Sequence, residues 1–311
     1  MRIVFMGTPE FSIPCLDILN NSNHEIVAVV TATDKPAGRG KKLKSSAIKK
    51  YAVENNLNLL QPEKLKNQIF IDNLKNLNAD IFIVIAFRML PKIVWNIPRY
   101  GTVNLHASLL PNYRGAAPIN WAIINGEKES GITTFFINEE IDKGSIILQE
   151  SIKIEDKFSA GDLHDIMMIK GAKLILETVN KIENNSVKEI EQDVLTKTFK
   201  TAPKLSKDIC KIKWNSSAKS ITNHIRGLNP FPGAWTTLTN GEINKHFKIF
   251  SADISNEIIG LGILKIINNQ LYIGCNNGSI RLIEVQIEGK KRMLAEDFIK
   301  GNIMINNYYT L

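Results

Sequence analysis

Cysteine and long apolar runs are both scarce in this sequence of 311 residues. The three cysteines, Cys15, Cys210 and Cys275, lie far apart and form no C-x-x-C pair, so their spacing favours neither a zinc site nor a disulfide framework. No run of 18 or more apolar residues occurs, and the first apolar run, Arg2–Met6, is too short to resemble a signal peptide. We therefore expect a cytoplasmic protein with reduced thiols, no membrane association and no bound metal.

A dinucleotide-binding fingerprint is also missing. Gly7–Phe11 follows the first apolar run and places a glycine where a strand would turn into a helix, but it is not G-x-G-x-x-G. This segment is therefore more typical of a structural turn with Pro9 near the helix start. The missing fingerprint argues against a dinucleotide-dependent dehydrogenase.

Basic residues outnumber acidic ones, and the excess is unevenly distributed. The chain carries 39 Lys and Arg against 31 Asp and Glu, a net charge of +8, and residues 206–311 hold +5 of it, with 13 basic and 8 acidic residues. Such a balance suits a polyanionic partner such as nucleic acid. Because a composition rich in Ile, Asn and Lys is also typical of an AT-rich genome, the position of the charge is more informative than its total.

Short apolar runs alternate with helix-spaced stretches over the first two-thirds of the chain. The runs are continuous and β-branched, as in buried strands: Ile3–Met6, Ile26–Val30, Ile81–Ala86 and Val103–His106, followed by Gly131–Ile137 and Ile146–Ile154. Helical spacing covers Phe11–Asn20, Ser45–Asn55, Ile69–Asn76 and most of Asp156–Lys181, where Ser159 is a possible helix cap. This alternation predicts an α/β domain over 1–188 with a Rossmann-like, doubly wound and mostly parallel sheet. In such sheets ligands bind beyond the carboxyl ends of the strands.

The pattern changes after a polar segment, 189–205, which we interpret as a linker. A helix is expected over Ala218–Gly227, and five β-like runs separated by turn residues follow it: Ala234–Leu238, His246–Ala252, Gly262–Ile267, Gln270–Ile273 and Ser279–Gln286. These runs predict a second, smaller domain over 206–311, an OB-like β-barrel of five strands. Barrels of this kind often bind nucleic acid.

Asn104 and His106 are the first candidates for chemistry. They are two positions apart on one predicted strand, so their side chains share a face, while Leu105 points to the other. Histidine carries protons near neutral pH, and an asparagine amide can stabilise a developing oxyanion. A single histidine at a core strand is more often structural, so this pair alone leaves both interpretations open.

The residues that follow make the interpretation more specific. Asn104–Pro111 reads Asn-x-His-x-Ser-x-Leu-Pro, and Tyr113–Pro118 reads Tyr-Arg-Gly-Ala-x-Pro. Together they resemble the signature of the 10-formyltetrahydrofolate-dependent formyltransferases, and the resemblance spans nearly the whole chain. It implies that Asn104, His106 and Asp142 form the catalytic set, because Ile141–Gly144 corresponds to the Asp-x-Gly turn of the family. Glu139, Glu140 and Lys143 depart from the family pattern in that loop.

The resemblance also implies a folate site. Ile85–Pro91 corresponds to the folate-side loop of the family, although Phe87 and Arg88 stand where Tyr and Gly are usual. Arg88 has two interpretations, a contact with the glutamate tail of the folate or a plain solvated arginine. The residues expected to contact the folate are Phe87, Arg88, Met89, Ser108, Leu109, Leu110 and Pro111.

Three further segments resemble one branch of the family, whose members formylate methionyl initiator tRNA. The first is Gly7–Phe11, and the second is Asp34–Leu43, which resembles a basic insertion loop. Residues 35–50 contain seven Lys or Arg and no acidic residue, and Arg39, Lys41 and Lys42 are the expected contacts to tRNA phosphates and bases. The alternative for a lone charge run is a solvated loop. The third is Lys204–Lys207 with Ile225–Ala234, part of which also occurs in the sugar-nucleotide branch.

The implied reaction is transfer of the formyl group of 10-formyltetrahydrofolate to the α-amino group of methionyl initiator tRNA. Asn104 would stabilise the oxyanion, His106 would move the proton, and Asp142 would orient His106. We expect a monomer with a folate co-substrate. The alternatives are formyl transfer to an amino-sugar nucleotide or another small amine, and a non-catalytic RNA-binding protein that retained the fold.

Overall fold

The computed structural model describes residues 1–37, 42–194, 199–301 and 308–311, which form two compact units. The first unit consists of Met1–Gly115, Gly131–Ile152 and His164–Thr201. The second consists of Ala116–Ser130, Lys153–Leu163 and Ala202–Leu311. Among the residues described, no helix has both the length and the apolar character needed to cross a membrane.

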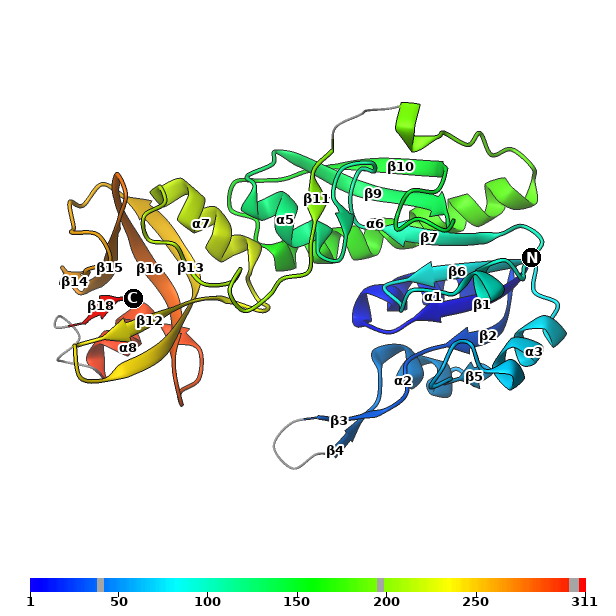
Figure 1. The fold of residues 1–311 in the computed structure, drawn as a ribbon, viewed down its shortest axis with the longest axis horizontal. Helices are drawn as coiled ribbons and strands as arrows, with labels where there is room; N and C mark the ends of the chain where they lie inside the picture. The colour runs from blue at the N-terminus through cyan, green and yellow to red at the C-terminus, as the bar shows by residue number, and fades with distance from the viewer. Residues whose placement is uncertain (38–41, 195–198, 302–307) are drawn as a thin grey trace. The chain divides into compact units, whose positions relative to one another are not determined.

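The first unit is built on the predicted Rossmann-like sheet. Seven strands lie side by side (Figure 1) in the order β10 (Ile146–Lys153), β9 (Glu129–Phe136), β7 (Thr102–His106), β6 (Ile81–Ile85), β1 (Arg2–Gly7), β2 (Glu25–Val30) and β5 (Leu59–Leu60). The strands from β5 to β7 are parallel, and β9 runs antiparallel to β7. The expectation of a doubly wound, mostly parallel sheet is confirmed.

The strand order reverses at β1. The chain proceeds from β1 through β2 to β5 and then returns to the other side of β1 to form β6 and β7. Gly7 at the end of β1 is in register with Ile85 at the end of β6, and a Cβ at Gly7 would lie 2.9 Å from the Ser12 side chain. The Ser12 hydroxyl donates to the Ile85 carbonyl at 2.9 Å. The turn after β1 is therefore closely packed against the end of β6. It lies next to the point where the strand order reverses, which is where parallel sheets bind their ligands.

Helices cover both faces of this sheet. Those of the first unit are α1 (Ile13–Asn20), α2 (Ala47–Glu54), α3 (Gln68–Asn76), α4 (Lys92–Trp95) and most of α6 (Ala160–Glu183). On one face, Phe70 and Leu74 of α3 and Val94 of α4 share a buried cluster with β1, β2 and β6. On the other face, Gly171 of α6 packs so closely on Leu105 of β7 that a Cβ there would lie 2.7 Å from the leucine side chain.

Helix α6 begins at Ala160, directly after Ser159, which the sequence indicates as a possible cap. The Ser159 hydroxyl accepts the Asp162 N–H at 3.2 Å, and the Asp162 carboxylate accepts the Ser159 N–H at 2.8 Å. This reciprocal pair is a capping box, with aspartate in the place of the usual glutamate. It satisfies amide groups that open a helix, so the first turn forms at Ala160.

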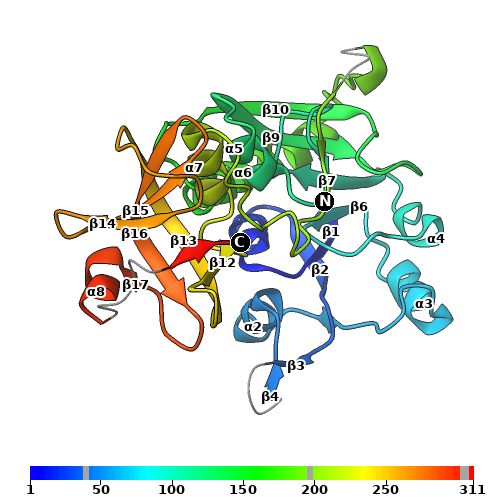
Figure 2. The ribbon, with the colours of Figure 1, turned by 60° about the vertical axis from the view of Figure 1, so that its left-hand side comes forward.

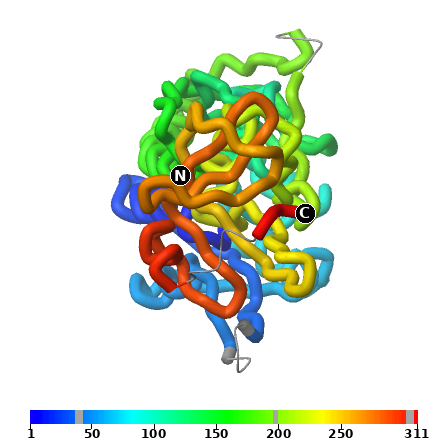
Figure 3. Tube along the Cα trace, turned by 90° about the vertical axis from the view of Figure 1, so that its left-hand side faces the viewer, coloured from blue at the N-terminus to red at the C-terminus, as the bar shows by residue number. Residues whose placement is uncertain are grey.

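The second unit is a nearly closed antiparallel barrel with helices packed on it. Its strands follow the order β14 (Leu264–Ile267), β15 (Gln270–Cys275), β16 (Gly278–Ile287), β13 (Asn244–Ser255), β12 (Ala234–Thr239) and β18 (Tyr309–Thr310), and β17 (Met293–Leu294) pairs with β16. A bridge between Ile263 and Tyr309 and a 2.9 Å bond from Thr310 N–H to the Gly262 carbonyl link the two ends of this order. Figure 2 shows the strands of the barrel from a second direction, and Figure 3 shows the course of the chain, coloured yellow to red over this part, from a third.

The five predicted β runs of the second unit are confirmed as β12 to β16, and β17 and β18 are two further short strands that the sequence did not reveal. The helices of this unit are α5 (Pro118–Ile124), α7 (Ala218–Gly227) and α8 (Ala295–Lys300). Helices α5 and α7 pack closely, and the Asn120 amide of α5 donates to the Gly227 carbonyl of α7 at 2.8 Å. A Cβ at Gly227 would lie 2.5 Å from the Ile124 side chain. The glycine therefore allows the two helices to approach each other.

Candidate active site

Asn104 and His106 lie at the carboxyl end of β7, on the face opposite to Leu105. In register, Asn104 lies beside Val84 of β6 and Phe135 of β9. The His106 side chain is almost fully buried, whereas Asn104 is half-buried. Within the described part of the chain, the Asn104 amide makes no hydrogen bond. Amide groups in proteins normally have a hydrogen-bond partner. The Asn104 amide, which has none among the described residues, is therefore available to donate to a bound substrate.

The two ring nitrogens of His106 have different partners. Nε2 lies 2.8 Å from the Tyr113 carbonyl oxygen, which can only accept, so Nε2 carries a proton and donates it to that bond. Nδ1 is the remaining nitrogen, and it lies 3.9 Å from Oδ2 of Asp142. In the neutral ring Nδ1 is therefore the nitrogen that can accept a proton, and the resulting imidazolium would face the carboxylate.

Asp142 is held in the loop between β9 and β10. Its backbone adopts a φ of 54°, a conformation that aspartate tolerates better than most residues. Its Oδ2 accepts the Gly115 N–H at 2.9 Å. Two residues later, a Cβ at Gly144 would lie 1.6 Å from the Phe136 carbonyl oxygen, so only glycine fits. The Asp-x-Gly pattern thus produces a tight turn that fixes the carboxylate beside His106.

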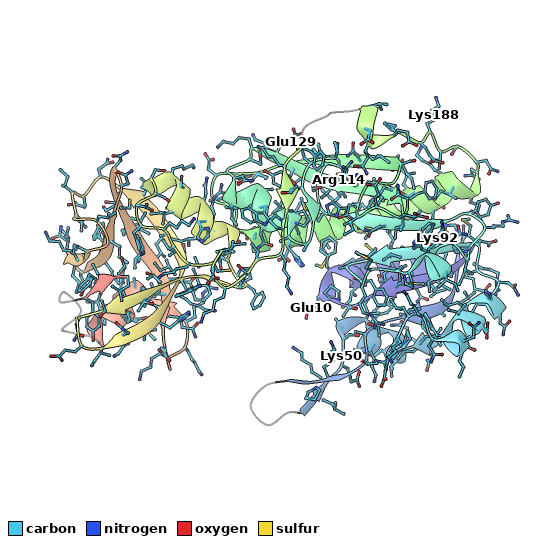
Figure 4. All side chains as sticks on the ribbon, in the orientation of Figure 1. Glu10, Lys50, Lys92, Arg114, Glu129 and Lys188 are labelled. Carbon is cyan, nitrogen blue, oxygen red and sulfur yellow. The ribbon has the colours of Figure 1, made fainter. Side chains whose placement is uncertain are left out.

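Ion pairs account for the unusual residues of this loop. Glu139 pairs with Lys92 of α4, which is labelled in Figure 4, and Glu140 pairs with Lys143. The hydrogen bond from Lys92 and its positive charge lower the pKa of the Glu139 carboxyl. Each of the three residues that depart from the family pattern therefore pairs with a residue of opposite charge.

The side chains of the Ser108–Pro111 turn are largely used within the protein. The Ser108 hydroxyl donates to the Asn112 carbonyl at 2.6 Å, and Leu110 packs with Phe135 and Ile146. The Thr133 hydroxyl donates to the Ser108 carbonyl at 2.6 Å and accepts the Leu110 N–H at 3.1 Å. The turn is therefore a rigid wall next to His106, and its contact with folate stays a prediction.

The loop after β6 carries the other predicted folate contacts. The Arg88 guanidinium donates to the Pro62 carbonyl at 2.8 Å and the Glu63 carbonyl at 3.0 Å, and it lies 5.3 Å from the centre of the Phe87 ring. This arginine is therefore joined to the protein backbone, an arrangement that neither sequence interpretation included. Phe87 packs against the core under α3, whereas Met89 is 73% exposed and can contact a ligand.

The basic insertion begins as a hairpin of β3 (Lys35–Ala37) and β4 (Lys42–Lys44). Arg39 and Lys41 lie outside the described residues, and the backbone of Lys42 pairs with that of Ala37. At the base of the hairpin, Lys49 donates to Asp34 at 2.6 Å, and this bond, followed by one from Gln61, lowers the pKa of the Asp34 carboxyl.

A basic and aromatic surface lies on the barrel of the second unit. We call it the Trp235 surface and define it as Lys207, Lys211, Trp235, His246 and Lys248. The lysine ammonium groups of Lys207 and Lys211 lie 5.4 Å and 5.7 Å from the indole centre, and the His246 ring stacks on the indole at 5.0 Å. Burial, followed by the charges of Lys248 and Lys207, lowers the pKa of His246. Lysines around a partly exposed aromatic ring are typical of surfaces that bind nucleic acid.

Sequence reasoning missed two features of these sites. Trp235 and His246 face each other across two strands, and the strand pattern predicts both strands but not their register. Gln192, a buried residue next to the Asp142 loop, lies in the segment that we interpreted as a linker. Within the described residues, no group of three or more His, Cys, Asp or Glu side chains is arranged to hold a metal ion.

Comparison with known proteins identifies the family. The formyl transferase family model matches residues 1–179, and the model of the formyl transferase C-terminal domain matches residues 204–302. The methionyl-tRNA formyltransferase of Flavobacterium johnsoniae is 50% identical over 304 residues, which is 97% of this chain and 96% of the relative. The methionyl-tRNA formyltransferase of Bacteroides thetaiotaomicron is 45% identical over 314 residues, 99% of this chain and 98% of the relative.

A solved structure shares the fold. The sugar 3N-formyl transferase WlaRD superimposes with a TM-score of 0.63 at 23% identity, over 94% of this chain and 99% of that chain. The two family models and the full-length similarity to the bacterial relatives assign the chain to one group of formyl transferases. The chain belongs to the methionyl-tRNA formyltransferase family.

Proposed function

We propose that this protein transfers the formyl group of 10-formyltetrahydrofolate to the α-amino group of methionyl initiator tRNA, giving formylmethionyl-tRNA for translation initiation. The observation that carries the proposal is the 50% identity, over 97% of the chain, to a relative named for this reaction. The arrangement of Asn104, His106 and Asp142 at one sheet edge supports it, because acyl transfer to an amine needs an oxyanion donor and a proton carrier.

The Asn104 amide stabilises the negative charge that develops during the reaction. The neutral methionyl amine attacks the formyl carbon, and the carbonyl oxygen becomes an oxyanion in a tetrahedral intermediate. A half-buried amide that makes no hydrogen bond to the residues that the structure describes can donate to this oxygen at no cost to the fold. Donors placed for an oxyanion typically contribute about 100- to 1,000-fold in rate.

His106 moves one proton between the two reacting nitrogens. Its Nδ1 accepts the proton that the attacking amine loses, and the imidazolium faces Asp142 across 3.9 Å. When the bond between the formyl carbon and N10 of the folate breaks, the same proton passes to N10. The products are the formylated amine and tetrahydrofolate, so no proton is gained or lost overall.

The folate is proposed to lie between the loop after β6 and the turn after β7. Phe87, Arg88 and Met89 would form one side, and Ser108–Pro111, mainly through its backbone, the other. The bound 5-N-formyl-THF named for the sugar 3N-formyl transferase supports a reduced folate as the donor. No metal is proposed, and we propose a cytoplasmic monomer.

The tRNA is proposed to bind through both parts of the chain. Residues 1–188 would form the catalytic domain, 189–205 the linker, and 206–311 the tRNA-binding domain. Arg39, Lys41 and Lys42 would contact the acceptor end, and the Trp235 surface would contact phosphates elsewhere on the tRNA.

A panel of acceptors tests the proposal. The purified protein is given 10-formyltetrahydrofolate with methionyl initiator tRNA, a charged elongator tRNA or an amino-sugar nucleotide, and the formylated product is measured. We expect the initiator tRNA to be formylated with the highest kcat/KM. Preferred formylation of the amino-sugar nucleotide would replace the proposal with the alternative, a reaction for which structural neighbours of 23% and 20% identity are named.

A further inference from the structure

Gln192 uses every hydrogen-bonding position of its side chain in the first unit. It is 1% exposed. Its Nε2 donates to the Asp142 carbonyl at 3.0 Å and to the Gly144 carbonyl at 2.8 Å. Its Oε1 accepts from Arg114, at 3.0 Å from Nε and 2.7 Å from Nη2. A primary amide has two N–H donors and two lone pairs, so this one is fully satisfied.

The amide joins the two backbone segments that fix the Asp142 carboxylate. One segment, Asp142–Gly144, carries the carboxylate itself. The other begins at Arg114, labelled in Figure 4, and continues to Gly115, whose N–H donates to the carboxylate at 2.9 Å. Any shift of one segment relative to the other would move the Asp142 carboxylate relative to His106.

The chain around Gln192 is itself anchored. Ile190 exchanges two backbone hydrogen bonds with Ile146 of β10, at 2.9 Å and 3.0 Å. The Arg114 guanidinium lies 4.5 Å from the centre of the Phe199 ring, which fixes it from a second side. Gln192 therefore acts from a rigid support, as a positioning group must.

We propose that Gln192 is a positioning residue for formyl transfer: it holds the Asp142 carboxylate beside Nδ1 of His106 and touches neither substrate. The inference rests on the proposed function. It follows from the geometry, because the attraction between an imidazolium and a carboxylate 3.9 Å away weakens as they separate, and water screens it little where both side chains are largely buried. Displacement of a catalytic group by about 1 Å can cost roughly 100-fold in rate.

Glutamate at position 192 separates the two roles of the Gln192 side chain, which are to accept hydrogen bonds from Arg114 and to donate to the carbonyls of the Asp142 loop. Gln192→Glu keeps an acceptor for Arg114 but turns an oxygen, instead of an NH2 group, toward the Asp142 and Gly144 carbonyls. The loop then loses two donors while the buried guanidinium keeps its partner. Gln192→Met together with Arg114→Met is a second variant, which removes the buried charge and its partner at once.

The experiment measures kcat and both KM values for formylation of methionyl initiator tRNA. We expect Gln192→Glu and the double Met variant to lower kcat by about 10- to 100-fold, with both KM values within about twofold of the wild type. Gln68→Glu is the matched control, because Gln68 donates its amide to Asp72 at 2.8 Å on the exposed face of helix α3. Its kcat should stay at the wild-type level. Thermal unfolding verifies that each variant is folded.

A double-mutant cycle with Asp142→Ala distinguishes positioning from a general structural effect. If Gln192 acts through Asp142, Gln192→Glu changes kcat by less than about twofold once Asp142 is alanine. Full, additive losses would overturn the inference, and so would a kcat of Gln192→Glu equal to that of the wild type or a change in KM alone. Wild-type protein that fails to formylate methionyl-tRNA would overturn the proposed function itself, a result that the acceptor panel shows independently.

Discussion

The polar side chains of the candidate active site differ in the hydrogen bonds that they already make within the protein. His106 is bonded through Nε2 and Asp142 through Gly115 N–H, but the Asn104 amide has no hydrogen-bond partner in the described residues. A group with no structural task can be removed with little effect on folding. Asn104 therefore offers the cleanest test of a single catalytic contribution.

Asn104→Ala should lower kcat by about 100- to 1,000-fold, because the oxyanion loses a donor. The KM values should change little, since the oxygen of the bound formyl group is not yet charged. Steady-state formylation of methionyl-tRNA measures both. Asn21→Ala, which removes an amide bonded to Asp17 at the end of α1, is the control and should leave kcat unchanged. A kcat of Asn104→Ala close to that of the wild type would remove Asn104 from the mechanism.

Sequence alone predicts these residues to different extents. The i, i+2 spacing of Asn104 and His106 on a strand places them on one face without any comparison. Asp142 lies 36 residues after His106 in the sequence, and only the family resemblance connects it to them. Gln192 carries no sequence signal, because its role depends on two loops that meet only in the folded chain.

The conformation of the loop between β9 and β10 depends on a single residue, Gly144. Gly144→Ala should lower the free energy of unfolding by at least about 2 kcal/mol, because its Cβ would overlap the Phe136 carbonyl and the loop must move. The same movement should displace Asp142 and lower kcat. Chemical denaturation and formylation assays measure the two effects. Gly301→Ala, where the nearest atom would lie 3.9 Å away, is the control. Equal stability of the two variants would contradict this description of the loop.

Helix α7 should make folding of the second unit sensitive to acid. Burial lowers the pKa of His224, and its Nε2 has no hydrogen-bond partner in the described chain. As pH falls below about 6.5, the ordinary value, the unfolded chain takes up a proton before the folded protein does, so stability falls. Thermal unfolding at pH 7.5 and 5.5 should show a smaller decrease for His224→Gln than for the wild type. An equal decrease in both proteins would rule out His224 as a source of the effect.

The hairpin of β3 and β4 should contribute affinity for tRNA and not for folate. Substitution of Arg39, Lys41 and Lys42 by Gln should raise KM for methionyl-tRNA and leave KM for folate unchanged. The logarithmic salt dependence should become shallower by roughly one unit for each lost phosphate contact. Kinetics at several salt concentrations measure this change.

Three lysines of helix α6 provide a control with the same change of charge. Substitution of Lys170, Lys173 and Lys181 by Gln should leave the salt dependence of tRNA binding near the wild-type value. If the hairpin variant and the α6 variant weaken tRNA binding equally, net charge and not the hairpin is responsible. If only the folate KM rises in the hairpin variant, the hairpin has been assigned to the wrong substrate.

Elements with strong periodicity could be predicted, and short ones could not. The five β runs of the second domain and helix Ala218–Gly227 match the structure closely, because alternating and amphipathic patterns extend over enough residues. Strand β18 has two residues, and β5 also has two. Elements of this length carry no period of their own and form only because neighbouring backbone groups need partners.

In the whole molecule, each of the two compact units is made of three separate segments of the chain, whereas the sequence analysis predicts two consecutive domains. The second unit takes in Ala116–Ser130 and Lys153–Leu163 as well as Ala202–Leu311. These early segments supply α5 and the cap of α6, and α5 packs on α7. The domain boundaries at 188 and 206 stay a prediction about which part of the chain carries which function. The compact units instead describe which segments pack together.

The most direct test is whether formyl transfer by the intact protein depends on His106, the residue proposed to move the proton. The transfer of a labelled formyl group from 10-formyltetrahydrofolate to the amine of methionyl initiator tRNA is followed in a single turnover, for the wild type and for His106→Ala, with both substrates saturating. His164→Ala serves as the histidine control. We predict rapid labelling of the methionyl amine by the wild type and the control, and a rate about 100- to 10,000-fold lower for His106→Ala. Labelling by His106→Ala at the wild-type rate, or no labelling of the tRNA by the wild type, would contradict the mechanism.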